Sequence, residues 1–112
     1  MKITEVKTAA ENANPHNVSV RMLYNKVHGQ AIHIQLEPGQ RLRKHITPVD
    51  VFFYVLEGKG IVEIGDEQES VSPDMLIESP AKIPHRLLND SDGVFRFLVI
   101  KTPRQVESTQ LL

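Results

Sequence analysis

The chain has 112 residues, 40% of them hydrophobic, which suits one domain that buries a single core without disulfides or metals. Its 13 basic and 14 acidic residues leave a net charge of -1, so no general attraction to nucleic acid is expected. The absence of cysteine excludes disulfides, thiol catalysis and thiolate metal sites. The first residues form no apolar leader, and no run approaches the ~20 apolar residues of a membrane span. We therefore expect a cytoplasmic protein with no membrane partner.

Short runs rich in β-branched and aromatic residues alternate with turn signals along the chain, which predicts many short strands. Only residues 8–13 look helical, for at most two turns, and residues 103–112 are predicted to be a C-terminal tail. This pattern favours an all-β antiparallel sandwich or barrel, with a single domain over residues 1–112 and a core over about 18–102. The predicted strands are residues 18–24, 31–36, 51–56, 61–64, 75–77 and 94–101.

For two histidines in the first third of the chain, the neighbouring residues indicate where the side chain lies. His16 follows a proline in a polar stretch and is predicted to lie on the surface. In the strand over 31–36, His33 alternates with the apolar Ile32 and Ile34, so it lies on the other face. That face either lines the interior, where His33 would be a ligand, or carries an ordinary hydrogen-bonded strand histidine.

Two later segments each place a histidine between strand-like runs. Residues 39–58 contain His45, with a glycine at each end of the segment, and residues 74–89 contain His85. In the second segment Pro80 lies before the histidine and Asn89 lies four residues after it. These spacings predict that both imidazoles enter one cavity.

The two segments resemble the two conserved motifs of the cupin superfamily. The first motif of that family is Gly, five residues, His-x-His, three or four residues, Glu, six residues, Gly. The second is Gly, five residues, Pro-x-Gly, two residues, His, three residues, Asn. The resemblance implies a double-stranded antiparallel β-helix, the RmlC-like jelly-roll barrel, closed around a lumen that holds a small ligand.

The family's metal ligands are only partly present. Thr47 occupies the position of the second histidine and Val51 that of the glutamate, while Asp74 and Lys82 replace the two glycines of the second motif. Two of the four implied ligands remain, His45 and His85. The resemblance therefore implies a weakened site for one divalent transition metal, with iron, manganese, nickel and zinc as the candidates.

Two carboxylates are candidates for a third ligand. Asp50 lies beside the family's glutamate position, and a β-bulge near Pro48 would turn it inward. Glu78 lies on the strand that leads to His85. Either would complete a set of two histidines and one carboxylate. In the opposing interpretation Asp50 caps a turn, Glu78 faces water, and the histidines are buried residues without a metal.

Other side chains are placed around the predicted pocket by strand alternation. Phe53 and Val55 share the parity of His45 and would form an apolar floor. Arg41 and Arg43 also share it, so either would bind a carboxylate or phosphate unless this charged stretch faces solvent. The predicted ligand pocket is Arg41, Arg43, His45, Thr47, Phe53, Tyr54, Val55 and His85.

Two functions are compatible with the sequence. In the first, the protein binds a small molecule in the lumen, as a sensor or an accessory protein. In the second, it is a metal-dependent enzyme, dioxygenase-like or isomerase-like, that uses His45, His85 and one of the two carboxylates. A homodimer is also expected, because many cupins pair with a second copy and twofold symmetry is the commonest closed arrangement.

Overall fold

One short 3-10 helix and ten β-strands make up the regular structure of residues 1–112 in this computed structural model. The helix, η1, spans Val6–Thr8. The strands are β1 (Ser19–Lys26), β2 (Gly29–Leu36), β3 (His45–Ile46), β4 (Asp50–Glu57), β5 (Gly60–Ile64), β6 (Glu67–Val71), β7 (Leu76–Ser79), β8 (His85–Leu88), β9 (Phe95–Thr102) and β10 (Gln110–Leu111).

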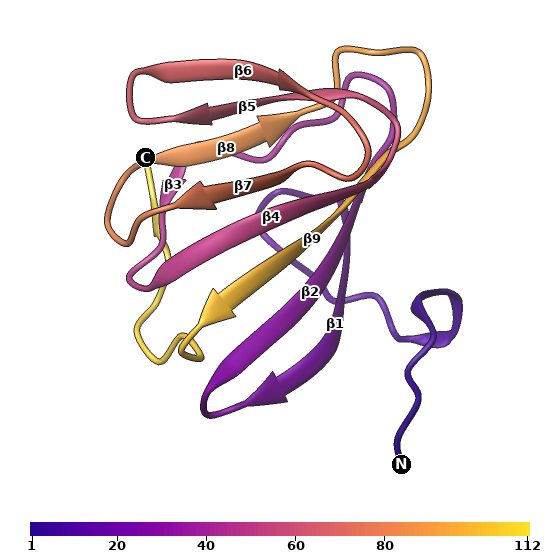
Figure 1. The fold of residues 1–112 in the computed structure, drawn as a ribbon, viewed down its shortest axis with the longest axis vertical. Coiled ribbons are helices and arrows are strands. Elements are labelled where there is room, and N and C mark those ends of the chain that lie inside the picture. Colours follow the sequence, from indigo (N-terminus) through magenta and orange to yellow (C-terminus); the bar gives the residue numbers. More distant parts are fainter.

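The strands form two five-stranded antiparallel sheets. One has the order β1-β2-β9-β4-β7 and the other the order β10-β3-β8-β5-β6. Figure 1 shows β5, β6 and β8 in one layer, with β4, β9, β2 and β1 in the other. From β7 to β9 consecutive strands lie in alternate sheets, as in a jelly roll. The predicted all-β fold is therefore confirmed, but the sheets do not close into a barrel, because each keeps two edge strands.

The core lies between the two sheets and follows the two-residue period of the strands. In β4 and β9, alternate residues are buried, and Phe53, Phe95 and Phe97 are each 1% exposed or less. Fully burying a side chain of this size contributes about 1.5 to 3 kcal/mol. The 13 core residues are Ile32, Ile34, Leu36, Leu42, Val51, Phe53, Val55, Val62, Val71, Leu87, Phe95, Phe97 and Val99.

Two glycines explain the sharp connection between β4 and β5. Gly58 has a φ of +80°, and a Cβ there would overlap the carbonyl group of Val94. A Cβ on Gly60 would overlap the ring of Phe95, which is completely buried. The glycine that ends the first histidine segment is therefore needed for both its conformation and its packing.

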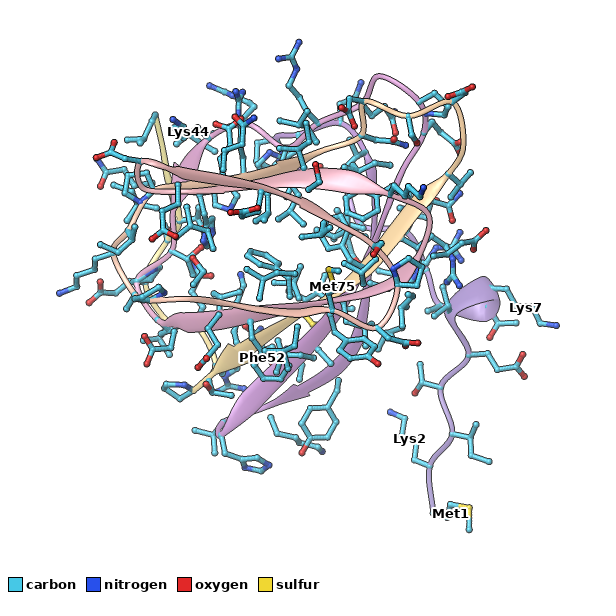
Figure 2. The ribbon with its side chains drawn as sticks, turned by 45° about the horizontal axis from the view of Figure 1, so that its top comes forward. Met1, Lys2, Lys7, Lys44, Phe52 and Met75 are labelled. Carbon is cyan, nitrogen blue, oxygen red and sulfur yellow. The ribbon has the colours of Figure 1, made fainter.

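The N-terminal segment runs away from the sheets at its start and returns along β1. Figure 2 shows Met1, Lys2 and Lys7 outside the sandwich, whereas Lys44 and Phe52 lie on opposite layers. The helix predicted over 8–13 is wrong, since only Val6–Thr8 is helical. The side chains of Asn12, in this stretch, and Asn14, just after it, hydrogen-bond the backbone instead, which competes with helix formation. None of the helical structure has the length and apolar character needed to cross a membrane.

The predicted C-terminal tail is partly ordered as a strand. Gln110 and Leu111, which form β10, pair with Ile46 and His45 of β3. Leu112 extends this pairing, because its N–H donates to the carbonyl of Lys44 at 3.1 Å. The chain therefore ends beside the first histidine segment.

Candidate functional site

His45 and His85 come together between the sheets. They lie opposite each other in the pairing of β3 with β8, and they are 9% and 2% exposed. Their ring centroids are 4.5 Å apart in an edge-to-face arrangement, and the two Nε2 atoms are 3.1 Å apart. The structure thus places the two imidazoles at one point, as their motif spacings predict.

Hydrogen-bond partners fix the tautomers of this pair. The carbonyl of Arg43 is only an acceptor, so the Nδ1–H of His45 donates to it at 2.6 Å. In the neutral ring, Nε2 of His45 is then an acceptor, and the Nε2–H of His85 donates to it. Nδ1 of His85 in turn accepts from the hydroxyl of Ser79 at 2.6 Å. The result is a chain of three hydrogen bonds that all donate in the same direction, from Ser79 through His85 and His45 to the carbonyl of Arg43.

Thr47 completes the polar cluster. Its side chain is 2% exposed, and its Oγ1 lies 3.2 Å from Nε2 of His85. Because that nitrogen carries the proton, Thr47 accepts a share of the same hydrogen bond. Its own hydroxyl hydrogen has no other acceptor in the protein. Thr47 therefore offers a donor at the position where the family has a second histidine.

The cluster lies at a cavity of about 260 Å³ between the sheets. We call this space the histidine cavity. Larger depressions on the surface, beside the N-terminal segment and beside β6, contain none of these histidines. Apolar side chains, most of them from the first sheet, form much of the cavity wall: Val20, Ile32, Ile34, Leu42, Phe53 and Val99.

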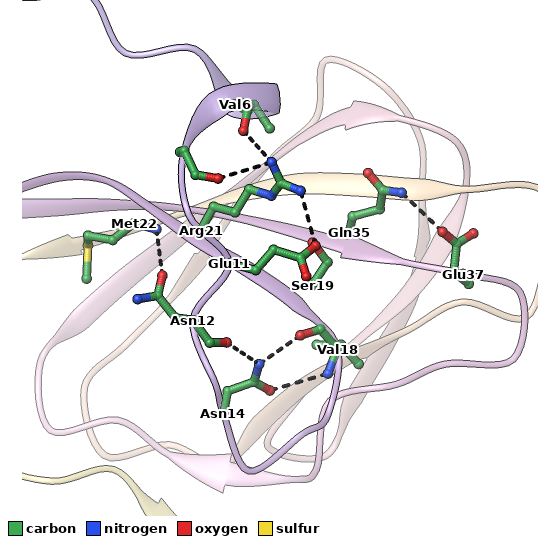
Figure 3. A network of polar contacts seen from close by, with 11 residues as sticks. Val6, Glu11, Asn12, Asn14, Val18, Ser19, Arg21, Met22, Gln35 and Glu37 are labelled. Carbon is green, nitrogen blue, oxygen red and sulfur yellow. Dashed lines mark hydrogen bonds and ion pairs between the residues drawn. The ribbon is translucent and has the colours of Figure 1, made fainter.

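His16 also lines the histidine cavity, although the sequence places it on the surface. Its ring centroid lies 5.1 Å from that of His45, and its Nδ1 accepts the N–H of Arg43 at 2.8 Å. The side chain of Asn14 holds the loop that carries His16. It accepts the N–H of His16, and it bonds to the backbone of Val18 at both its amide nitrogen and its oxygen (Figure 3). No periodic pattern marks a loop residue, so the sequence contains no signal for this position.

Lys101 is the only lysine or arginine that lines the cavity. It follows the buried Phe97 and Val99 at the two-residue spacing of β9, so its stem points between the sheets. Its Nζ donates to the side-chain oxygen of Gln105 at 2.6 Å. Strand alternation could have identified this residue from the sequence.

The C-terminal segment covers one side of the cavity. Thr109 and Leu111 are among the lining residues. Gln105 joins this segment to the sheet: its side-chain oxygen accepts from Lys101, while its Nε2 donates to the carbonyl of Glu107 and to Thr109. The segment predicted as a tail is therefore part of the cavity wall.

Burial controls the charge state of the cavity. Desolvation lowers the pKa of His85 to about 3 and that of His16 to about 4, with smaller effects of neighbouring charges. It also lowers the pKa of His45, partly opposed by the hydrogen bond to Arg43. All three imidazoles are therefore neutral at pH 7. Burial lowers the pKa of the Lys101 ammonium as well.

The predicted arginines lie outside the cavity. Arg41 and Arg43 are both exposed, whereas Leu42 between them is buried. The prediction assumed one regular strand from Arg41 to His45, but the first arginine forms only an isolated bridge to Leu88. The regular strand begins at His45, so the alternation does not carry back to the arginines.

Two further pocket candidates also lie elsewhere. Tyr54 is on the outer face of its sheet, where its hydroxyl donates to Asp74 at 2.8 Å. Val55 faces inward and is completely buried, but it belongs to the core and does not line the histidine cavity. Of the predicted pocket, the structure brings together His45, Thr47, Phe53 and His85.

His33 lies on the far side of its sheet from the cavity. The cavity is lined by the neighbouring Ile32 and Ile34, so the apolar face of β2 points inward. His33 is 1% exposed, and its Nε2 accepts from Arg96 at 2.9 Å. It is a hydrogen-bonded strand histidine, which is the second of the two interpretations of its pattern.

Neither candidate carboxylate reaches the histidines. Asp50 is exposed and accepts the N–H of Ala81 at 2.8 Å. The expected bulge is absent there, since the pairing of β4 with β9 is regular from Asp50 to Val55. Glu78 is exposed and lies opposite Phe52 on the outer face. The prediction of either carboxylate as a third ligand is therefore wrong: Asp50 bonds to the turn at Ala81, and Glu78 lies on the surface.

The remaining donors do not fit a resident divalent metal. No group of three or more histidine, aspartate or glutamate side chains is arranged to hold an ion. The cavity contains the imidazoles of His16, His45 and His85 and the hydroxyl of Thr47, but five of the six ring nitrogens are already hydrogen-bonded within the protein, whereas catalytic metal sites commonly use three strong protein ligands. The nearby ammonium of Lys101 adds a positive charge that opposes a cation. The chemistry of this site is therefore that of the protein's own donors and acceptors.

Comparison with known proteins agrees with this architecture. Residues 32–101 match the cupin domain family. The crystal structure of TT1209 from Thermus thermophilus is 30% identical, with 93% of this chain and 99% of that chain covered and a TM-score of 0.80. The polyketide cyclase RemF from Streptomyces resistomycificus is 19% identical, with 100% and 85% covered and a TM-score of 0.86.

A predicted oxalate decarboxylase from Thermotoga maritima is 14% identical, with 91% of this chain and 99% of that chain covered and a TM-score of 0.80. At 19% and 14% identity, the similarity of the cyclase and of the predicted decarboxylase to this chain concerns the fold alone. No curated protein matches this chain. The family match spans more than half of the residues and includes both histidine segments up to β9. The chain belongs to the cupin family.

Proposed function

We propose that this cupin binds a small molecule in the histidine cavity. The observation that carries the proposal is the convergence of His45, Thr47 and His85 on a cavity of about 260 Å³ that has a largely apolar wall. Apolar walls with a few convergent polar groups are the usual composition of a small-molecule site. The walls provide contact area and the polar cluster orients the ligand.

The cavity limits the size of the ligand. A volume of 260 Å³ corresponds to about nine water molecules at ~30 Å³ each. A compound of about ten non-hydrogen atoms is therefore the expected size. Burial of its hydrocarbon part against Phe53, Ile32 and Val99 would supply most of the binding energy.

The polar cluster orients such a ligand without changing its own charge. The imidazoles of His45 and His85 stay neutral at pH 7, and the carbonyl of Arg43 at the end of their hydrogen-bond chain fixes both tautomers. Thr47 presents a hydroxyl hydrogen that the protein does not use. A ligand oxygen next to Thr47 would accept this hydrogen bond, and ligands without an acceptor there would bind more weakly.

This proposal is preferred over the metal-dependent enzyme because both carboxylates that the enzyme requires lie outside the cavity. The cyclase and the predicted decarboxylase named above share the fold at 19% and 14% identity, so their activities are not transferred to this chain. The function follows from the cavity itself.

A thermal-shift screen of polar compounds with about ten non-hydrogen atoms tests the proposal, followed by NMR titration of the best compounds. We expect shifts of the His45 and His85 ring signals. Binding should weaken in Thr47→Val, which keeps the volume and removes the hydroxyl. Thr102→Val is the matched control, because Thr102 is exposed at the end of β9. Compounds that bind without moving either ring signal would contradict the proposal.

A further inference from the structure

Lys101 introduces a positive charge into the histidine cavity without a balancing negative charge. No aspartate or glutamate lines this cavity, and none of the five ion pairs of the protein includes Lys101. Its hydrogen-bond partner is the neutral amide of Gln105. A partly buried ammonium that lacks a counterion is costly to hold away from water.

The free polar atoms of the cavity are mainly donors. The acceptor nitrogens of His45 and His85 are occupied by each other and by Ser79. The ring of His16 accepts through Nδ1, so in its neutral form the proton is on Nε2, which has no partner in the protein. Thr47 adds a hydroxyl hydrogen.

Lys101 contributes further donors, because only one of its three ammonium hydrogens is needed for the bond to Gln105. The donors that remain available therefore come from an ammonium, an imidazole and a hydroxyl. A ligand group that matches them carries acceptor atoms and a negative charge.

From these observations we propose that the ligand is a small organic monocarboxylate, with its carboxylate held by the ammonium of Lys101. This inference rests on the proposed function and names the class of molecule bound. The cavity holds one fixed positive charge, which balances a single carboxylate better than a phosphate or a dicarboxylate. The apolar walls then contact the hydrocarbon part of the acid.

The proposed anion site is therefore at Lys101 and not at Arg41 or Arg43, where the sequence places it. Arg41 and Arg43 are exposed, so they are not available inside the cavity. Lys101 is instead on the inward face of β9, on the same wall as Val99. The charge recognition and the apolar contact thus come from neighbouring positions of one strand.

The test compares two acids with their uncharged amides, which keep nearly the same shape: benzoate with benzamide, and isobutyrate with isobutyramide. Calorimetric titration at pH 7 is carried out on wild-type protein and on Lys101→Met, which keeps a linear side chain and removes the charge. Lys101→Arg restores a cation at the same position. Lys59→Met is the matched control, because Lys59 is exposed in the turn between β4 and β5.

We expect wild-type protein and Lys59→Met to prefer each acid over its amide by about tenfold or more. The preference should disappear in Lys101→Met, which would still bind the amides, and return in part in Lys101→Arg. If acid and amide bind equally well to wild-type protein in the histidine cavity, the carboxylate assignment is overturned while the proposed function stands. If the preference survives in Lys101→Met, the anion is held elsewhere. If neither acids nor amides bind and the wider screen also finds no ligand, both proposals fail.

Discussion

The two Nε2 atoms of His45 and His85 lie 3.1 Å apart, and the other nitrogen of each ring has its own partner inside the protein. A peptide carbonyl at one end of the chain makes the direction of all three hydrogen bonds unambiguous. His45 therefore carries its proton on Nδ1 and His85 on Nε2. The pair acts as a single neutral unit.

Nitrogen-15 NMR of the imidazole rings provides a direct check of this arrangement. At pH 7 we expect one Nδ1–H and one Nε2–H tautomer for the buried pair, because Arg43 can only accept and Ser79 donates. Ser79→Ala should leave both tautomers unchanged, because the Nε2–H of His85 still donates to the acceptor Nε2 of His45, which the carbonyl of Arg43 fixes. Finding the Nε2–H form on both rings of the wild-type protein would contradict this direction of the hydrogen bonds.

Acid should destabilise the protein through its buried histidines. His85 has a pKa of about 3 in the folded protein, against an ordinary value of 6.5, so the unfolded chain binds the proton first as the pH falls. The contribution of His85 to the free energy of unfolding should be at its maximum above about pH 6.5 and should fall as the pH is lowered. By about pH 4.5, His85 alone accounts for a loss on the order of 2 to 3 kcal/mol.

Urea unfolding across this pH range measures the effect. His16 and His33, whose pKa values are each lowered to about 4, act in the same direction. His85→Gln should therefore flatten the dependence without abolishing it. His28→Gln is the control, because His28 is exposed in the turn between β1 and β2. An unchanged slope in His85→Gln would show that this histidine does not titrate as described.

The packing of the β4–β5 connection predicts a sharp difference between two glycines. Gly60→Ala should destabilise the protein by about 1 to 3 kcal/mol, since the new methyl group meets the buried ring of Phe95. Gly93→Ala should be nearly neutral, because a Cβ there meets nothing within 4 Å. Chemical denaturation of both variants is the measurement. Equal effects would show that Gly60 is not packed against Phe95.

Metal binding should be weak. No carboxylate reaches His45 and His85, and their ring nitrogens bond to each other, to Arg43 and to Ser79, so titration with nickel, zinc or iron(II) should show no stoichiometric binding at micromolar concentration. Thr47→His adds a third imidazole beside His85 and should tighten binding by about ten- to a hundredfold. Tight binding by the wild-type protein that is lost in His85→Ala would contradict the assignment of a metal-free cavity. If it survives in that variant, the ligands lie elsewhere.

The homodimer remains a prediction. The outer face of the first sheet carries apolar side chains in neighbouring strands, with Phe52 opposite Ile100 and Tyr54 opposite Leu76, which is 53% exposed. A second copy of this chain is the expected partner. Sedimentation of untagged protein at micromolar concentration should give twice the mass of the 12.7 kDa chain. A single species at 12.7 kDa would count against pairing.

Motif spacing predicts the most constrained part of the site from sequence. His45 and His85 each lie in a segment with glycine or proline at its turns. Because these residues fix the turns, matching the residue spacing of the family motifs also matches the positions of the two histidines in space. The six predicted strands correspond to β1, β2, β4, β5, β7 and β9. The shorter strands β3 and β10, of two residues each, are too short for an alternation pattern to mark them.

Alternation predicts inward faces only where a strand is regular. It succeeds for Phe53 and would have found Lys101, both on eight-residue strands. It fails for Arg41 and Arg43, because the chain before His45 is irregular. His16 could not be found in this way, since a loop bound to Arg43 by a single hydrogen bond brings it to the cavity.

The walls of the histidine cavity join residues that are very distant in sequence, from His16 in the first loop to Leu111 in β10. These residues are far apart in the unfolded chain, because bringing them together costs the entropy of closing the intervening chain. The cavity therefore exists only in the folded protein, and a ligand that fills it should raise the free energy of unfolding as its concentration exceeds its dissociation constant.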